Sequence, residues 1–117
     1  ITIPSSVVKI GTRAFQSSGL TTIELPSSIT SIDYGLFSSC SDLVSVKIPS
    51  SVESIGENAF VGCTSLTNLE LSSSVKSIGV MAFYGCENLD LVIDNSEDNV
   101  EVAVQAFQNC KSVTWKK

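Results

Sequence analysis

The sequence predicts an α/β-type repeat solenoid that consists mostly of short parallel strands and turns and contains little helix. One motif recurs along the whole chain with a period of about 23 residues, which is typical of solenoids. Each copy carries one phenylalanine, and apolar residues recur at the same few places around it. These observations predict a single array of five stacked units, the last divergent or a cap: residues 1–22, 23–45, 46–68, 69–92 and 93–117.

The recurring apolar places form columns that run across the units. A unit that buries so few side chains cannot offset the conformational entropy of its own backbone, so stacking is required for stability. In chain order the columns are Ile1, Ile23, Val46, Leu69 and Ile93; Ile3, Leu25, Ile48, Leu71 and then Asn95; Val7, Ile29, Val52, Val75 and Val100; Ile10, Ile32, Ile55, Ile78 and Val102; and Phe15, Phe37, Phe60, Phe83 and Phe107.

Each unit opens with an Ile-x-Ile or Leu-x-Leu alternation, which predicts a short strand with one buried face. In the first unit this strand is residues 1–3. Pro4, Pro26 and Pro49 follow the first three strands, and a proline suits a strand end because it has no N–H for the ladder. Ser72 replaces the proline in the fourth unit. We expect one such parallel strand per turn.

The middle of each unit, VESIGENAF in its clearest copy, predicts turns and 3₁₀-like backbone, with one helical turn over residues 58–61. The segment is too short to form a stable helix by itself. Gly11, Gly56 and Gly79 each follow the isoleucine of this segment, which predicts a backbone turn with positive φ. Asp33 and Ala103 occupy the equivalent place in the second and fifth units.

The closing half of each unit reads C-x-x-L-x-x-L-x-L, as in Cys63-x-x-Leu66-x-x-Leu69-x-Leu71. This matches the leucine-rich-repeat skeleton L-x-x-L-x-L-x-x-N, with Ser74 in the asparagine place. The string LPSSITSI…LFSSCSDLVSVKIPSSVESIGENAFVGCTSLTNLEL resembles the BspA-like leucine-rich repeats, whose consensus is roughly IP-x-x-V-x-x-IG-x-x-AF-x-x-C-x-x-L. The resemblance covers essentially the entire chain and is closer in the first four units than in the fifth.

This resemblance implies a right-handed leucine-rich-repeat superhelix and a non-enzymatic protein-binding function. It also implies a cell-surface or secreted protein of a host-associated bacterium or protozoan, with adhesion or host-protein recognition as its role. The partner would then be a host matrix or cell-surface protein, and we expect the chain to be monomeric. The alternative is a passive structural spacer that projects another domain from the cell surface.

Charge and composition exclude several other functions. The net charge is −5, and the seven basic residues are not clustered, whereas a nucleic-acid binder needs a basic stripe. No apolar run is long enough to span a membrane. Histidine is absent, and neither a Ser/His/Asp set nor a glycine-rich phosphate loop is present, so we expect no enzyme activity and no cofactor. The chain starts within a strand pattern, which suggests a fragment of a longer protein.

The cysteines form a further column, and two interpretations of it remain open: disulfides between neighbouring turns, or free thiols. Equivalent positions in neighbouring turns are close enough for a disulfide, but side chains in a stacked column point in parallel directions. We therefore favour free, buried thiols that act as small apolar plugs. A zinc site is not expected, because the spacing is unlike that of a zinc pair. The four residues are Cys40, Cys63, Cys86 and Cys110, with Ser18 in the first unit.

The fifth unit replaces the Pro-Ser-Ser turn with the acidic stretch DNSEDNVE, residues 94–101. We interpret this stretch as a solvated cap, because terminal repeats need a polar outer face. A calcium site is the alternative, since calcium takes several carboxylate oxygens. Its ligands would be Asp94, Glu97, Asp98 and Glu101.

The candidate binding surface is the outward, concave face of the strand ladder. Residues between the two inward apolar positions of each strand must point outward, and those just before the strand lie one row away. The predicted protein-binding residues are Thr22, Glu24, Ser45, Lys47, Asn68 and Glu70. Thr2 and Asp94 would extend one of these rows and Val92 the other.

Two other interpretations of the surface remain. The alternating charges of Glu24, Lys47 and Glu70 also fit simple cross-strand pairing. A second possible contact face lies on the outer turn, where several large side chains have no burial partner in the sequence pattern. These are Tyr34, Val61, Val80, Met81 and Tyr84.

Overall fold

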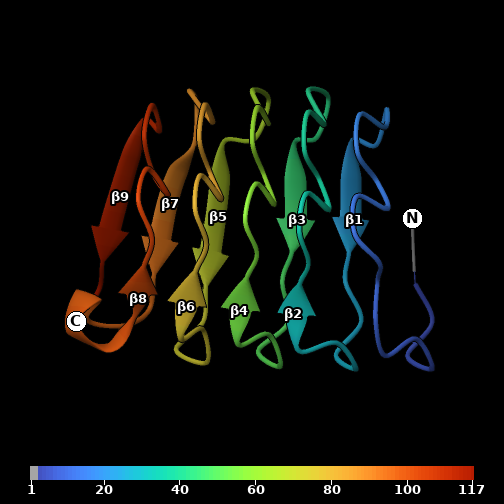
Figure 1. Ribbon diagram of the computed structural model, residues 1–117, viewed down its shortest axis with the longest axis horizontal. Helices are drawn as coiled ribbons and strands as arrows, with labels where there is room; N and C mark the ends of the chain where they lie inside the picture. Colours follow the sequence, from blue (N-terminus) through green and yellow to red (C-terminus); the bar gives the residue numbers. More distant parts are fainter. Residues whose placement is uncertain (1–2) are drawn as a thin grey trace.

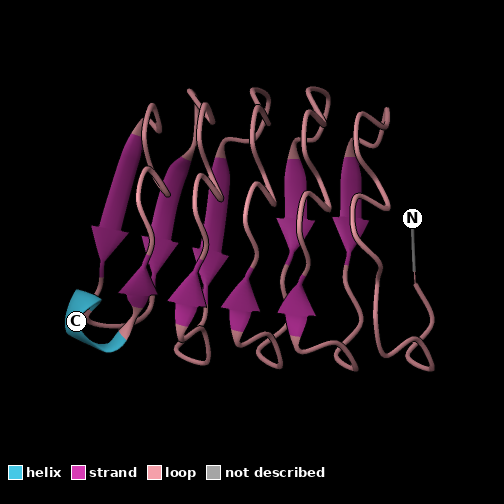
Figure 2. Cartoon of the chain, viewed as in Figure 1, coloured by secondary structure: helices cyan, strands magenta, loops and turns pink. Residues whose placement is uncertain are grey.

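The computed structural model describes residues 3–117 and shows two layers of short parallel strands wound into a solenoid (Figure 1). It measures 33 × 25 × 20 Å. A single 3₁₀ helix, η1, is the only helix in the described residues (Figure 2). The expected solenoid of strands and turns with little helix is therefore confirmed. The first layer contains β1 (Thr22–Glu24), β3 (Ser45–Lys47), β5 (Asn68–Leu71), β7 (Asp90–Ile93) and β9 (Ser112–Trp115); the second contains β2 (Ser31–Ile32), β4 (Ser54–Ile55), β6 (Ser77–Ile78) and β8 (Glu101–Val102), and η1 spans Glu97–Asn99.

The second layer was not expected, and the prediction of one strand per turn is wrong. Strands β2, β4, β6 and β8 form a continuous parallel sheet in which Ile32, Ile55 and Ile78 face inward. The backbone continues this pairing into the turn, where Gly56 N–H donates to the Ile32 carbonyl at 2.7 Å. Strands of two residues are too short to show a period-two pattern, so the sequence carries little signal for them.

The register of the last turns differs from the predicted columns. Leu69 pairs with Leu91, and Leu71 pairs with Ile93, so Ile93 belongs to the third apolar position and not to the first. Asn95 consequently lies beyond the strand. Leu91 follows Leu69 by 22 residues, one fewer than the 23 by which Val46 follows Ile23. The additional residues of the last unit lie after β7, in the loop that contains η1. At the other end, Ile1 and Thr2 of the expected first strand lie outside the described residues, and Ile3 is not in a strand.

The phenylalanine column forms a continuous stack inside the solenoid, as predicted. Successive ring centroids are 5.7, 5.2, 5.0 and 6.2 Å apart. The three central rings, Phe37, Phe60 and Phe83, are fully buried. At the C-terminal end, Trp115 packs edge-on against Phe107 with centroids 6.2 Å apart, and so covers the end of the stack.

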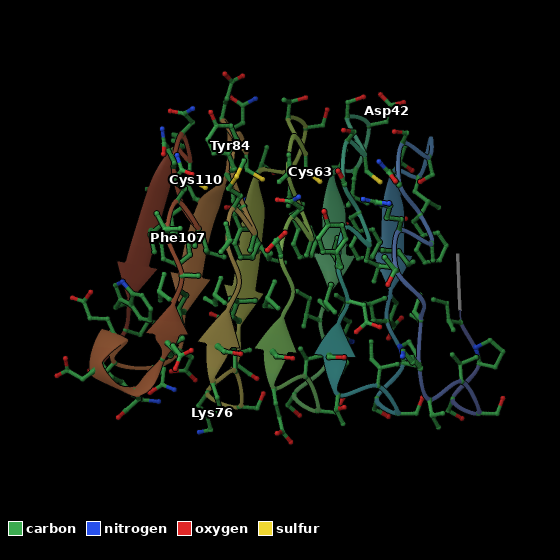
Figure 3. All side chains as sticks on the ribbon, viewed as in Figure 1. Asp42, Cys63, Lys76, Tyr84, Phe107 and Cys110 are labelled. Atoms are coloured by element: carbon green, nitrogen blue, oxygen red, sulfur yellow. The ribbon has the colours of Figure 1, made fainter. Side chains whose placement is uncertain are left out.

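The four cysteines are free, and each thiol donates a hydrogen bond to a phenylalanine carbonyl of the preceding turn. The sulfur-to-oxygen distances lie between 2.9 Å (Cys40 to Phe15) and 3.2 Å (Cys63 to Phe37). Figure 3 shows Cys63 and Cys110 at the same end of their turns. The thiols are therefore more than apolar plugs, because they also link each turn to the one before it.

Two of these thiols, Cys86 and Cys110, have a raised pKa. The Cys110 thiol lowers the pKa of Cys86, but the neighbouring Cys63 thiol and burial outweigh it and raise this pKa from 9.0 to about 12. The neighbouring Cys86 thiol, together with burial, also raises the pKa of Cys110.

Each turn enters the left-handed backbone region at two places, and neither is the place predicted. Gly11, Gly56 and Gly79 have no positive φ, and Asn58, at the start of the predicted helical turn, has φ of 59°. No helix forms over residues 58–61. The residues with positive φ are Arg13, Gly35, Asn58, Met81 and Gln105 in one column, and Ser17, Ser39, Gly62, Gly85 and Asn109 in the other.

The glycines after the isoleucines have a different role, which is close contact between turns. A Cβ on Gly56 would lie 2.8 Å from the Ile32 carbonyl oxygen, and one on Gly79 would lie 2.6 Å from the Glu57 nitrogen. A Cβ on Gly11 would have no atom within 4 Å. The backbone of one turn therefore approaches the previous turn at this column in the middle of the solenoid.

Candidate functional site

The outward face of the first strand layer carries all six predicted site residues. Strands β1, β3 and β5 alternate exposed and buried positions, with Ile23, Val46 and Leu69 buried between exposed neighbours. The register aligns Thr22 with Ser45 and Glu24 with Lys47. The structure thus brings the predicted residues onto one exposed surface in two rows. We call this surface the strand face: Thr22, Glu24, Ser45, Lys47, Asn68 and Glu70, extended by Asp90, Val92, Ser112 and Thr114.

The last four members of the strand face were missed or misplaced by the sequence pattern. Asp90 aligns with Asn68, and Val92 aligns with Glu70, so Val92 lies in the row of Glu70 and not in the row of Asn68 as predicted. The prediction that Asp94 extends the row of Glu70 is wrong, because Asp94 follows the strand. Leu89, Leu91 and Ile93 occupy alternate positions, and Val92 is apolar as well, so registers that differ by two residues fit the sequence pattern equally well.

Charged residues on this face form ion pairs at its surface. Lys47 Nζ lies 3.6 Å from Glu24 Oε2, as cross-strand pairing predicts. Glu70 pairs with Lys116 at 3.7 Å, and Asp90 pairs with Lys111 at 3.5 Å. Pairs between exposed side chains contribute about 0–1 kcal/mol, so a binding partner can displace them at little cost.

Asp90 stays ionised at neutral pH. The Ser112 hydroxyl donates a 2.6 Å hydrogen bond to its carboxylate, and this bond, with the Lys111 ammonium, holds the pKa of Asp90 below its usual value. Ser112 and Lys111 lie in and just before β9, which pairs with β7.

Two hollows lie on the strand face. The larger, with a volume of about 450 Å³, lies at the ends of β1 and β3 and is lined by Glu24, Lys47 and the Pro-Ser segments that follow these strands. The smaller, about 290 Å³, spans β3, β5 and β7 and is lined by Asn68, Glu70 and Asp90 among others. Each hollow therefore contains predicted site residues.

The outer turn offers a second, less exposed surface. Its five predicted residues are only partly exposed, and Val104, which continues their row, is 67% exposed. The Arg13 guanidinium lies over the Tyr34 ring, 5.0 Å from its centroid, and covers part of the aromatic surface.

The acidic stretch forms part of the C-terminal end of the solenoid. Lys117 Nζ lies 2.9 Å from Asp94, and this contact lowers the pKa of the Asp94 carboxyl. Asn95 is buried and accepts hydrogen bonds from Ser96 N–H and the Asn99 amide. Within residues 3–117, no group of three acidic, cysteine or histidine side chains is placed to hold a metal ion. These contacts fit the cap interpretation.

Comparison with known proteins identifies the repeat. A family model described as BspA type leucine rich repeat region matches residues 1–114 in six copies. The chain belongs to the BspA-type leucine-rich-repeat family. The division into five units remains a prediction, since the family model counts one copy more. A search of curated proteins found no match.

Solved structures of bacterial leucine-rich-repeat proteins have the same fold. A leucine rich cell surface protein of Faecalibacterium prausnitzii is 28% identical with a TM-score of 0.84, and the match covers 100% of this chain and 32% of that one. The leucine rich repeat protein of T. pallidum is 28% identical with a TM-score of 0.85, over 97% of this chain and 56% of that one. A leucine-rich repeat protein of Bacteroides ovatus, 24% identical with a TM-score of 0.74 over 98% of this chain and 37% of that one, shares the fold.

These relatives define the general class of this BspA-type array. The chain spans about a third and about half of the length of the first two matched proteins. Family and neighbours together indicate a repeat module for protein interaction, of a kind found at cell surfaces, and such repeats are generally non-enzymatic. No helix among the described residues is long and apolar enough to cross a membrane.

Proposed function

We propose that this BspA-type array binds a protein outside the cell through its strand face, in adhesion or in recognition of a host protein. The observation that supports this proposal is the common exposure of the six residues Thr22, Glu24, Ser45, Lys47, Asn68 and Glu70 on one side of the strand layer. Polar and charged side chains in regular rows leave a broad surface that a folded partner can approach. Solenoids use extended surfaces of this kind for binding.

The test reverses three charges of the strand face together: Glu24→Lys, Lys47→Glu and Glu70→Lys. Binding to immobilised extracellular-matrix and serum proteins is measured by surface plasmon resonance. We expect the reversed variant to bind at least about tenfold more weakly, because like charges placed against a complementary partner repel it. All three side chains are exposed, so the circular dichroism spectrum should not change.

The matched control makes the same changes on the second layer: Glu53→Lys, Lys76→Glu and Glu101→Lys. These residues are also exposed, and the change in net charge is identical. The control should bind as the wild type does. If the two variants lost binding equally, the loss would come from the change in net charge and not from a binding site on the strand face. No binding by the wild type to any of these proteins would support the passive spacer instead.

A further inference from the structure

The first strand layer is interrupted between β3 and β5. Its strands form two separate sheets, β1–β3 and β5–β7–β9, whereas the second layer is continuous (Figure 1). At the intact step between β1 and β3, Val44 N–H donates to the Thr21 carbonyl and Leu25 N–H to the Lys47 carbonyl. Neither bond has a counterpart between β3 and β5 in the described chain.

The interruption leaves backbone groups of β3 directed at the gap. The Lys47 carbonyl points toward β1, because it accepts the bond from Leu25. Backbone groups of successive strand residues point in opposite directions, so the N–H and carbonyl of Val46 point toward β5. No ladder satisfies them there. An unpaired strand edge is a place where another polar group can bind.

The smaller hollow lies over this interruption. It is lined by the backbone of the inward-facing residues Val46 and Leu69 and by the outward side chain of Val92. Its charged groups are the carboxylates of Glu70 and Asp90. The site therefore combines the apolar side chain of Val92, two anionic groups and the backbone groups of Val46 that face the gap. Both of its charged groups are hydrogen-bond acceptors.

We propose that this hollow receives an arginine side chain of the protein partner. A guanidinium has five N–H donors and no acceptor, and its planar fork matches carboxylates in a bidentate way. The aliphatic stem of an arginine covers apolar surface while its charged end remains at the rim. Arginine is also one of the residues that most often dominates the energy of a protein interface. This inference rests on the proposed protein-binding function and names the chemistry of its central contact.

The existing ion pairs leave room for such a ligand. Glu70 is held only by Lys116, at 3.7 Å between exposed side chains. Asp90 uses its Oδ1 for Ser112 and its Oδ2 for Lys111, and each carboxylate oxygen has a second acceptor position. Lys116 competes directly with an incoming guanidinium, so its removal should strengthen binding.

The experiment titrates the intact chain with the peptide acetyl-Gly-Arg-Gly-amide and follows the backbone amides by ¹⁵N NMR. A peptide with citrulline in place of arginine has nearly the same shape without the charge. We expect saturable shifts that are largest at Asn68, Glu70 and Val92 with the arginine peptide, and much weaker binding of the citrulline peptide. Equal shifts with the two peptides, or shifts centred outside the hollow, would overturn the proposal.

Variants separate this hollow from general attraction to an acidic protein. Glu70→Gln and Asp90→Asn should each raise the Kd of the arginine peptide about tenfold, since each removes a charged hydrogen-bond acceptor. Glu53→Gln, an exposed residue of the second layer, changes the net charge equally and should leave the Kd unchanged. Lys116→Gln should lower the Kd. A Kd that responds to Glu53→Gln as much as to Glu70→Gln contradicts the proposal.

The two proposals fail in different ways. If the charge-reversed strand face loses its protein partner but the arginine peptide does not bind in the hollow, the binding face stands and the arginine contact is wrong. If the peptide binds in the hollow but reversal of the strand face leaves protein binding unchanged, the proposed function is wrong instead.

Discussion

The left-handed positions show how much the repeat constrains single residues. Two columns adopt positive φ in every turn, yet only three of their ten members are glycine. Asparagine tolerates this region better than most residues. For arginine, methionine and glutamine the left-handed conformation costs about 1–2 kcal/mol of conformational free energy. The stacked turns hold these residues in place, because the neighbouring backbone fixes the path of the chain.

Replacing Gln105 by glycine should therefore stabilise the protein. Gln105 has φ of 60° and an exposed side chain, so Gln105→Gly relieves the backbone without removing buried contacts. We expect a gain of up to about 1 kcal/mol, since the added flexibility of the unfolded chain offsets part of it. Urea unfolding measures this. Gln108→Gly, three residues away with φ outside the left-handed region, should lose about 0.5–1 kcal/mol, and a loss of the same size in Gln105→Gly would contradict the explanation.

The raised thiol pKa values predict a dependence of stability on alkaline pH. Cys86 has a pKa of about 12 in the folded state, compared with 9.0 for an unperturbed cysteine thiol. Below pH 9 both states keep the proton, but above it the unfolded state loses the proton first, so the free energy of unfolding falls as pH rises from about 9 to about 12. Urea unfolding at pH 8 and pH 10.5 tests this. The variant Cys86→Ala should show a smaller fall, and an equal fall would assign it to other groups.

Backbone hydrogen bonds join each turn to its neighbours. The second layer and the carbonyl bonds of the glycine column bring successive turns very close at Gly56 and Gly79. A side chain there must displace the backbone of the adjacent turn. The first turn is free of this constraint, because a Cβ on Gly11 would contact nothing.

Gly56→Ala should accordingly destabilise the protein by roughly 1–3 kcal/mol, as overpacking does in a well-packed core. The new Cβ would lie 2.8 Å from the Ile32 carbonyl oxygen, a backbone atom that cannot move independently. Thermal unfolding followed by circular dichroism measures the loss. Gly11→Ala, in the same column, should be neutral or slightly stabilising. Equal effects of the two substitutions would mean that close approach is not the reason for glycine here.

The molecule as a whole is a one-dimensional stack, in which each turn contacts only its neighbours. Its C-terminal end is covered by Trp115 against Phe107 and is tied by the contact between Lys117 and Asp94. Stability in such an array depends on the end as well as on the middle, because an uncovered end can unfold turn by turn.

Removal of the terminal aromatic ring should loosen the stack from this end. We expect Trp115→Ala to reduce stability by about 2 kcal/mol, less than a fully buried aromatic would, because Trp115 is only partly buried. Hydrogen exchange should quicken in β9, β8 and β7 before it quickens in β4. Thr114→Ala, exposed on the neighbouring position, should change neither. Uniformly faster exchange along the chain would contradict unfolding from the end.

The sequence was sufficient for the solenoid, the phenylalanine stack and the six exposed residues of the first strands. These features follow from side-chain periodicity, since a residue between two buried isoleucines or leucines must face outward. Only the folded chain decided the second strand layer, the two columns of left-handed residues and the division of the first layer between β3 and β5. It also decided whether Leu91 or Ile93 pairs with Leu69. Each of these depends on backbone hydrogen bonds and contacts between successive turns, which the pattern of side chains along one turn does not specify.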